Sequence, residues 1–141
     1  MDAGKAAMPL ANEIDFIAVK VGDRDYCFAS KDVAFISMAK DSINILGYPS
    51  LPRCVVAVAS NNDRLFTVID AAQLFDLGVI TVDARARLIA FNHPELDAVM
   101  LLVNEITGRT SSPDQGIIPT TVQPEALVQM LQAVNAQAFG R

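Results

Sequence analysis

The most constraining feature of the sequence is a pair of short apolar runs separated by five polar residues. Residues 55–59 and 65–69 are rich in β-branched side chains, and the polar residues 60–64 between them include Asn and Asp. Runs of this kind are typical of buried strands, and Asn and Asp tolerate the positive φ angles of tight turns. The pattern predicts a β-hairpin with a polar tip. Asp70, directly after it, is placed to cap a short helix.

Further strand-like runs lie on both sides of this hairpin. Residues 14–21 and 25–29 are joined by a Gly-Asp turn, and residues 87–91 and 98–104 are joined by a polar segment that contains proline. Both arrangements predict antiparallel strand pairs. Residues 77–82 fit either a strand or a connecting loop.

Between the first two hairpins the pattern is weaker. Ser30 is placed to cap a short helical turn over residues 31–36, in which Val33 and Ile36 share a face. Residues 38–47 are mixed in character and are expected to be irregular. The two prolines of residues 48–52 exclude a helix and a central strand.

The C-terminal part has a different character. Residues 107–121 contain Gly, Ser and Pro at many positions and predict a loop. From Pro124 onward, apolar residues recur every three or four positions, which is typical of an amphipathic helix. We expect a helix over residues 123–139 that packs on the strands through Leu127, Leu131, Val134 and Ala138.

Composition excludes several classes of partner. The net charge is −5 and the isoelectric point about 4.6, and no cluster of Lys and Arg occurs. Nucleic acids and anionic membrane surfaces are therefore not expected as partners. With 52% hydrophobic and 19% charged residues the chain is globular, and no apolar run approaches the roughly 20 residues of a membrane span. We expect a cytoplasmic protein with a flexible lead-in at residues 1–12.

The chemistry-bearing residues form no recognisable active site. His93 is the single histidine and is expected in an exposed loop. Cys27 and Cys54 lie in apolar runs, which indicates buried reduced thiols, although a disulfide between them is the alternative. Metal-ligand spacing, a phosphate-binding loop and a nucleophile motif are absent from the sequence. We therefore predict no catalytic residue, no metal and no cofactor.

The order of these signals resembles the CheW-like family of adaptor domains from bacterial chemosensory arrays. The resemblance covers roughly residues 14–107. It rests on an opening hairpin (16–29), the apolar members of a V-x-E-I motif (Val33, Ile36), a Leu-Pro linker (51–52), a signature strand pair (58–70), a following Phe75, and a later strand pair (87–91 and 100–106).

This resemblance implies a mainly β fold of two intertwined SH3-like five-stranded barrels, without catalysis. It also implies a coupling role between chemoreceptor tips and the regulatory domain of a CheA-type histidine kinase, for chemotaxis or type IV pilus motility. The implied organisation is a CheW-like domain at residues 13–107, a loop at 108–122, and the helix at 123–139.

The chain departs from the family at places where members meet their partners. Asn62 and Asp63 replace an Arg-Gly pair at the hairpin tip, Phe35 replaces a glutamate, and Ala72 replaces an arginine. A return strand pair after Ile106 is expected to be missing, which leaves the first barrel incomplete. We expect the C-terminal helix or a second molecule to cover that gap, so a homodimer remains open.

The expected partner-binding residues follow from this comparison. They are Val33, Phe35 and Ile36, and the tip residues Asn62, Asp63 and Arg64. Two alternatives stay open: Val33 and Ile36 as core residues with the tip as a solvated turn, and a CheW-like regulatory protein with a different partner outside the receptor–kinase array.

Overall fold

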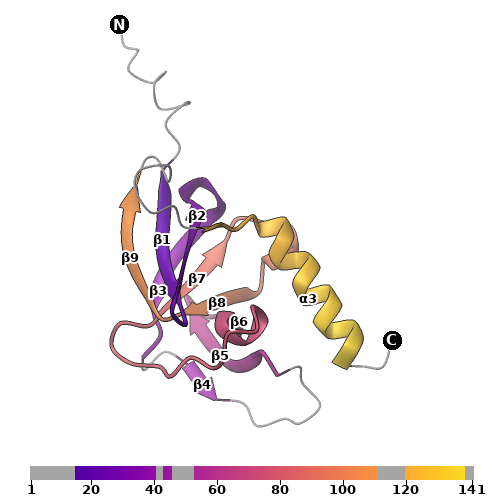
Figure 1. Ribbon diagram of the computed structural model, residues 1–141. Helices are drawn as coiled ribbons and strands as arrows, with labels where there is room; N and C mark the ends of the chain where they lie inside the picture. The colour runs from indigo at the N-terminus through magenta and orange to yellow at the C-terminus, as the bar shows by residue number, and fades with distance from the viewer. Residues whose placement is uncertain (1–14, 41–42, 46–52, 111–119, 139–141) are drawn as a thin grey trace, which may run out of the picture.

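The computed structural model describes residues 15–40, 43–45, 53–110 and 120–138, and these form two β-sheets with one long helix near the C-terminus (Figure 1). The elements are β1 (Phe16–Val21), β2 (Arg24–Ala29), the 3₁₀ turn η1 (Ser30–Asp32), β3 (Val33–Met38), β4 (Ile43–Ile45), β5 (Val55–Asn61), β6 (Arg64–Asp70), α2 (Ala71–Leu74), β7 (Arg87–Phe91), the 3₁₀ turn η2 (Pro94–Leu96), β8 (Val99–Val103), β9 (Glu105–Thr110), β10 (Thr120–Thr121) and α3 (Pro124–Ala138). In the described part of the chain no helix is long and apolar enough to cross a membrane.

The smaller sheet combines the two ends of the described chain. Its strand order is β10-β2-β1-β9, with β1 antiparallel to both β2 and β9, and β10 parallel to β2. The chain therefore leaves this sheet after β2, builds the second sheet, and returns to the first with β9. The expected opening hairpin is confirmed, and Gly22 supplies the positive φ angle (63°) of its turn.

The larger sheet has the order β3-β7-β8-β6-β5-β4. Neighbouring strands lie about 4.8 Å apart, so β3 and β6 would be about 14 Å apart if this sheet were flat. Instead, the rings of Phe35 on β3 and Phe66 on β6 meet edge to face, with centroids 5.8 Å apart. The sheet is therefore strongly curled, and its concave side forms much of the core.

The central hairpin prediction is confirmed. Strands β5 and β6 pair in antiparallel register from Val55 opposite Ile69 to Asn61 opposite Arg64. The tip is tighter than the five polar residues suggested, because only Asn62 (φ 50°) and Asp63 (φ 64°) form the turn. Two consecutive residues with positive φ match the twist of the flanking strands, which favours this two-residue connection.

The C-terminal helix is also confirmed. Leu127 is 2% exposed, and Val128, Leu131 and Val134 pack partly buried against the same core. Figure 1 shows α3 lying along one side of the strands, beyond β6 and β8. The apolar stripe that predicted the helix is thus the stripe that attaches it.

The predicted helical turn over residues 31–36 is wrong. Only the 3₁₀ turn η1 forms, and the chain then enters β3 at Val33, because β-branched and aromatic residues fit a pleated, half-buried surface. Ser30 does not cap this turn, and its buried hydroxyl has no hydrogen-bond partner among the described residues. On a strand, Val33 and Ile36 project to opposite sides rather than sharing a face.

Two segments expected to be irregular contain strands. Within residues 38–47, β4 pairs with β5, and residues 41–42 and 46–47 lie outside the described part of the chain. In residues 107–121, β9 continues to Thr110 and β10 adds a short parallel pair to β2. A strand therefore continues past Ile106 and pairs with β1, contrary to expectation. The local sequence does not reveal it, because its partner lies far away along the chain. Residues 77–82 form a loop, and residues 48–52 lie outside the described part of the chain.

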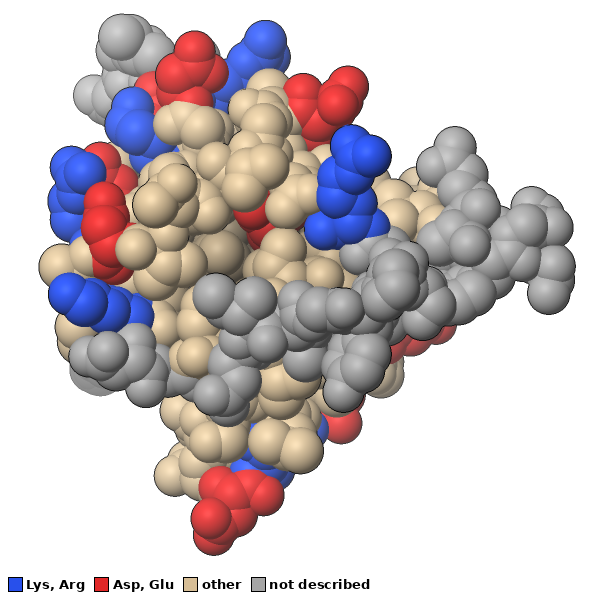
Figure 2. All heavy atoms as spheres, turned by 90° about the horizontal axis from the view of Figure 1, so that it is seen from below, with Lys and Arg blue, Asp and Glu red and all other residues tan. Residues whose placement is uncertain are grey.

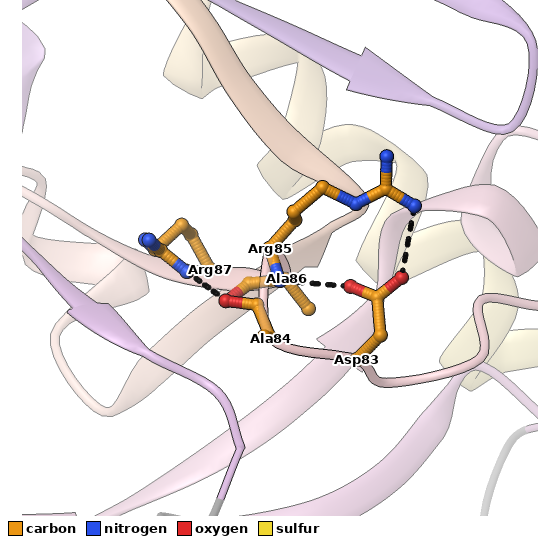
Figure 3. A network of polar contacts seen from close by, with 5 residues as sticks. All are labelled: Asp83, Ala84, Arg85, Ala86 and Arg87. Atoms are coloured by element: carbon orange, nitrogen blue, oxygen red, sulfur yellow. Dashed lines mark hydrogen bonds and ion pairs between the residues drawn. The ribbon is translucent and has the colours of Figure 1, made fainter.

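A compact polar turn leads that loop into β7. The Asp83 carboxylate accepts hydrogen bonds from the backbone N–H of Arg85 at 2.9 Å and from its guanidinium at 3.2 Å, and Arg87 donates to the carbonyl of Ala84 at 2.9 Å (Figure 3). The contacts with Arg85 hold the pKa of Asp83 below its ordinary value, and the backbone N–H of Arg85 is the largest cause.

Candidate protein-interaction surface

Strand β3 is the element around which the candidate surface is built. It lies at the edge of the larger sheet, and its side chains alternate between half-buried and exposed along its length. Val33 and Phe35 are half-buried, whereas Ile36 is 37% and Met38 54% exposed. Apolar side chains on an exposed strand edge are typical of surfaces that other protein segments cover.

A first cleft of about 460 Å³ lies beside β3, between it and the edge strand of the smaller sheet. We call it the β3–β9 cleft. Gly108 on β9 is one of its lining residues, and beyond its chain neighbours no atom lies within 4 Å of the position that a Cβ would take there. Its lining residues are Ile17, Ser30, Val33, Ala34, Phe35, Ile36, Ile106, Gly108 and Arg109.

A second cleft of about 400 Å³, the hairpin cleft, lies on the other side of Phe35. Arg64 makes several contacts in this cleft. Its guanidinium donates to the backbone carbonyl of Asp97 at 3.0 Å and lies 3.3 Å from the Asp97 carboxylate. It also lies 4.8 Å from the ring centroid of Phe66, a cation–π arrangement. The cleft is lined by Ala34, Phe35, Arg64, Phe66, Ala90, Phe91, Asn92, His93, Pro94 and Asp97.

His93 is not the exposed loop residue that the sequence suggested. Its side chain is 19% exposed, and its Nδ1 atom accepts a hydrogen bond from the backbone N–H of Glu95 at 3.1 Å, which caps η2. Its Nε2 atom lies 3.7 Å from the Glu125 carboxylate in the first turn of α3. His93 thus links the wall of the hairpin cleft to the C-terminal helix.

The structure brings together four of the six residues that the sequence singled out. Phe35 lines both clefts, Val33 and Ile36 line the β3–β9 cleft, and Arg64 lines the hairpin cleft. Asn62 and Asp63 form the exposed tip next to Arg64 and line neither cleft. Sequence reasoning missed the β9 wall of the first cleft, because the glycine and serine signals after Ile106 concealed a strand.

On the described part of the face shown in Figure 2, Lys and Arg side chains are interspersed with Asp and Glu side chains, and uncharged residues lie between them. Within the described ranges, no group of three or more His, Cys, Asp or Glu side chains is placed to hold a metal ion. The cysteines Cys27 and Cys54 are both buried and free, as the sequence indicated, and the alternative of a disulfide between them is wrong.

Comparison with known proteins gives a result at the level of the fold. No protein-family profile matches the chain, and no curated protein matches it in sequence. Among solved structures, it is similar to the scaffolding protein TtCheW from Thermoanaerobacter tengcongensis, with a TM-score of 0.58 and 16% sequence identity. The match covers 69% of this chain and 60% of that chain. The fold is CheW-like. At this identity the likeness concerns the architecture, and the chain spans less than two thirds of the length of TtCheW.

Proposed function

We propose that the protein is a non-catalytic adaptor of a bacterial chemosensory system, and that it couples receptors to a CheA-type histidine kinase for chemotaxis or type IV pilus motility. The observation that carries the proposal is the CheW-like fold with an open apolar cleft beside β3. Three of the six residues expected from the sequence to bind partners, Val33, Phe35 and Ile36, lie on that strand.

The topology supports a finer version of the fold proposal, in which the two sheets are two intertwined SH3-like barrels. The chain leaves the first sheet after β2 and returns to it with β9, which is the connectivity that intertwining requires. The curl that brings Phe35 to Phe66 is that of a barrel wall. In this arrangement the β3–β9 cleft lies between the two barrels.

The two clefts suit protein partners by their chemistry. The β3–β9 cleft has an apolar lining from Ile17, Val33 and Ile106 with Arg109 at its border, which is the arrangement of an interface with an apolar centre and a polar rim. Val33, Phe35 and Ile36 supply its β3 wall. In the proposal this cleft receives an apolar segment of a receptor or of the kinase regulatory domain.

A second candidate function is regulation of a different partner outside the receptor–kinase array. The observation that favours it is the state of the hairpin tip. Arg64 is held by Asp97 and stacked on Phe66, so it is not free to take the role of the arginine that family members carry at this tip. Asn62 and Asp63 present a turn with one acidic side chain instead.

A binding experiment with a matched pair of variants tests the proposal. The regulatory domain of the kinase and a soluble receptor tip from the same organism are titrated with the protein by calorimetry. Gly108→Phe adds a ring at a residue that lines the cleft and has room for a side chain, whereas Thr107→Phe adds the same ring one residue away, at an exposed position outside the cleft lining. Circular dichroism checks that both variants are folded.

If the protein is an adaptor, it should bind at least one of the two partners at micromolar concentration. The variant G108F should abolish this binding, and T107F should retain it. Binding to neither partner at concentrations well above micromolar contradicts the adaptor role and leaves the regulatory alternative. Equal binding by both variants contradicts the assignment of the cleft.

A further inference from the structure

A third cleft, of about 430 Å³, lies where β4 and β5 meet the loop of residues 77–82. We call it the loop cleft. No aromatic residue is among the described residues that line it. A volume of this size is within the range of small-molecule sites. Most of its wall is aliphatic, from β4 and β5 on one side (Ile43, Val56, Ala57) and from the loop on the other (Val79, Ile80, Val82).

One wall of the loop cleft is fixed by a buried carboxylate that has no acceptor site left for a ligand. Asp70 lines the cleft and is 1% exposed. Its Oδ1 atom accepts hydrogen bonds from the backbone N–H groups of Ala72 and Gln73. Its Oδ2 atom accepts from the backbone N–H of Ile80 and from the side-chain amide of Gln73. Because a carboxylate offers about four acceptor sites, these bonds fill them, and a ligand ammonium group would find no partner at Asp70.

The two charged residues that line the loop cleft give it a direction. Lys40 is exposed, so it lies at the mouth, whereas Ala57, Asp70 and Leu102 are 1% exposed or less and form the floor. The negative charge of Asp70 repels an anion from the floor, and the ammonium of Lys40 attracts an anion at the mouth. An elongated ligand with one anionic end is therefore oriented with that end at Lys40.

Val79 shows that part of this aliphatic wall faces water. Its side chain lines the cleft, yet the residue is 72% exposed. Removal of such apolar surface from water is favourable. A hydrocarbon chain that enters the cleft covers Val79 and at the same time contacts the buried Leu102.

We propose that the loop cleft binds a small aliphatic carboxylate, with the carboxylate at Lys40 and the hydrocarbon chain along Val79, Ile80 and Leu102. The aliphatic walls match a saturated chain, and the one cation at the mouth matches a single negative charge. The loop cleft shares no lining residue with the β3–β9 cleft or the hairpin cleft. The site is therefore independent of the proposed adaptor function, and its test requires no other protein.

Three ligands of equal chain length test the ligand class. Octanoate, octanol and octylamine are each titrated into the full chain, with calorimetry for affinity and methyl NMR spectra for the signals of Ile80 and Leu102. Octanoate should shift these methyl signals and bind about fivefold more tightly than octanol, with octylamine the weakest. The absence of shifts at several millimolar octanoate, or binding of octanol or octylamine as tight as that of octanoate, overturns the proposal.

Two matched pairs of variants at exposed positions test the site. Lys40→Gln should weaken octanoate binding by about fivefold, and Lys31→Gln, whose side chain is 71% exposed outside the cleft lining, should not change it. Val79→Asp adds a negative charge at the mouth and should weaken binding by about tenfold. Leu65→Asp is its control, at a residue that is 69% exposed and outside the lining. Circular dichroism checks the folding of each variant, and equal affinities within either pair overturn the assignment.

Discussion

The carboxylate of Asp70 accepts a hydrogen bond from the backbone N–H of Ile80 at 2.9 Å, across ten residues of chain. The same carboxylate accepts from the backbone N–H groups of Ala72 at 2.8 Å and Gln73 at 3.3 Å, and from the Gln73 side chain at 3.2 Å. Asp70 is 1% exposed, so these donors replace water entirely. One side chain thus caps α2 and fixes the loop that follows it.

We expect Asp70→Asn to lower the free energy of unfolding by about 2 to 3 kcal/mol, because the amide replaces a charged acceptor and places an N–H₂ group against N–H donors. Asp70→Ala should lower it further, since every donor then loses its partner. Urea denaturation measures both. Asp97→Asn is the control: its side chain is 74% exposed, and the expected loss is within about 0.5 kcal/mol. Equal losses at the two positions would contradict the role of Asp70.

The attachment of α3 can be tested on one buried and one exposed residue. Leu127 is 2% exposed and Met130 36% exposed, three residues apart on the same helix. Leu127→Ala should destabilise the protein by about 2 to 4 kcal/mol, whereas Met130→Ala should change stability by less than about 1 kcal/mol. Similar values in thermal denaturation would mean that the helix does not pack through this stripe. Deletion of residues 124–141 with unchanged stability and solubility would refute its covering role.

Substitutions of Phe35 and Ile36 distinguish a residue that packs in the core from one that lies on the surface of β3. Phe35 contacts the ring of Phe66, so Phe35→Ala should lower the free energy of unfolding by about 2 kcal/mol. Ile36 is 37% exposed and points to the other side of β3, so Ile36→Ala should lose about 0.5 kcal/mol or less. Ile36 is therefore the better position for binding studies. A larger loss at Ile36 than at Phe35 would place Ile36 in the core.

The pH dependence of the turn before β7 follows from Asp83. Because the pKa of this carboxyl is lower in the folded chain than in the unfolded one, its contacts stabilise the fold above the ordinary aspartate pKa and are lost as the pH falls through the folded value. Asp83→Asn should show a stability deficit at neutral pH that disappears in acid. A deficit that stays constant over the acid range would show that charge is not the cause.

Burial raises the pKa of the Cys54 thiol, with a smaller contribution from the Asp70 charge. Since the folded state disfavours the thiolate, stability should decline as the pH rises through the ordinary thiol pKa and beyond it. Iodoacetamide should leave Cys54 unmodified in the native protein at neutral pH and modify it in urea. Rapid alkylation of the native protein, measured by mass spectrometry, would contradict this burial.

The sequence predicted those parts of the fold in which the interacting residues lie close together along the chain. The β5–β6 hairpin, the Asp70 cap and α3 were all recognised because their patterns lie within a few residues of their partners. β9 was missed because its pairing with β1 spans most of the chain. The sequence predicts a helical turn in place of β3 because Val33 and Ile36 have helical spacing, and the pairing with β7 is what makes this segment a strand. Such long-range pairings override weak local preferences.

The candidate site was predictable to the same extent. Phe35 and Arg64 were singled out one at a time, yet the curl of the larger sheet is what makes them neighbours in one cleft. The contact between Arg64 and Asp97 joins the first residue of β6 to the turn after η2, and the sequence carries no signal that links these two places. The openness at Gly108 depends on where β9 lies, and β9 was itself missed.

The most direct test of the adaptor proposal is to map its contacts by NMR. Backbone amide shifts of the labelled protein are followed while the unlabelled kinase regulatory domain or the receptor tip is added. The account predicts saturable changes on β3 and β9, around Ile36 and Gly108, with α3 unaffected. No change with either partner, or changes confined to α3, would contradict it.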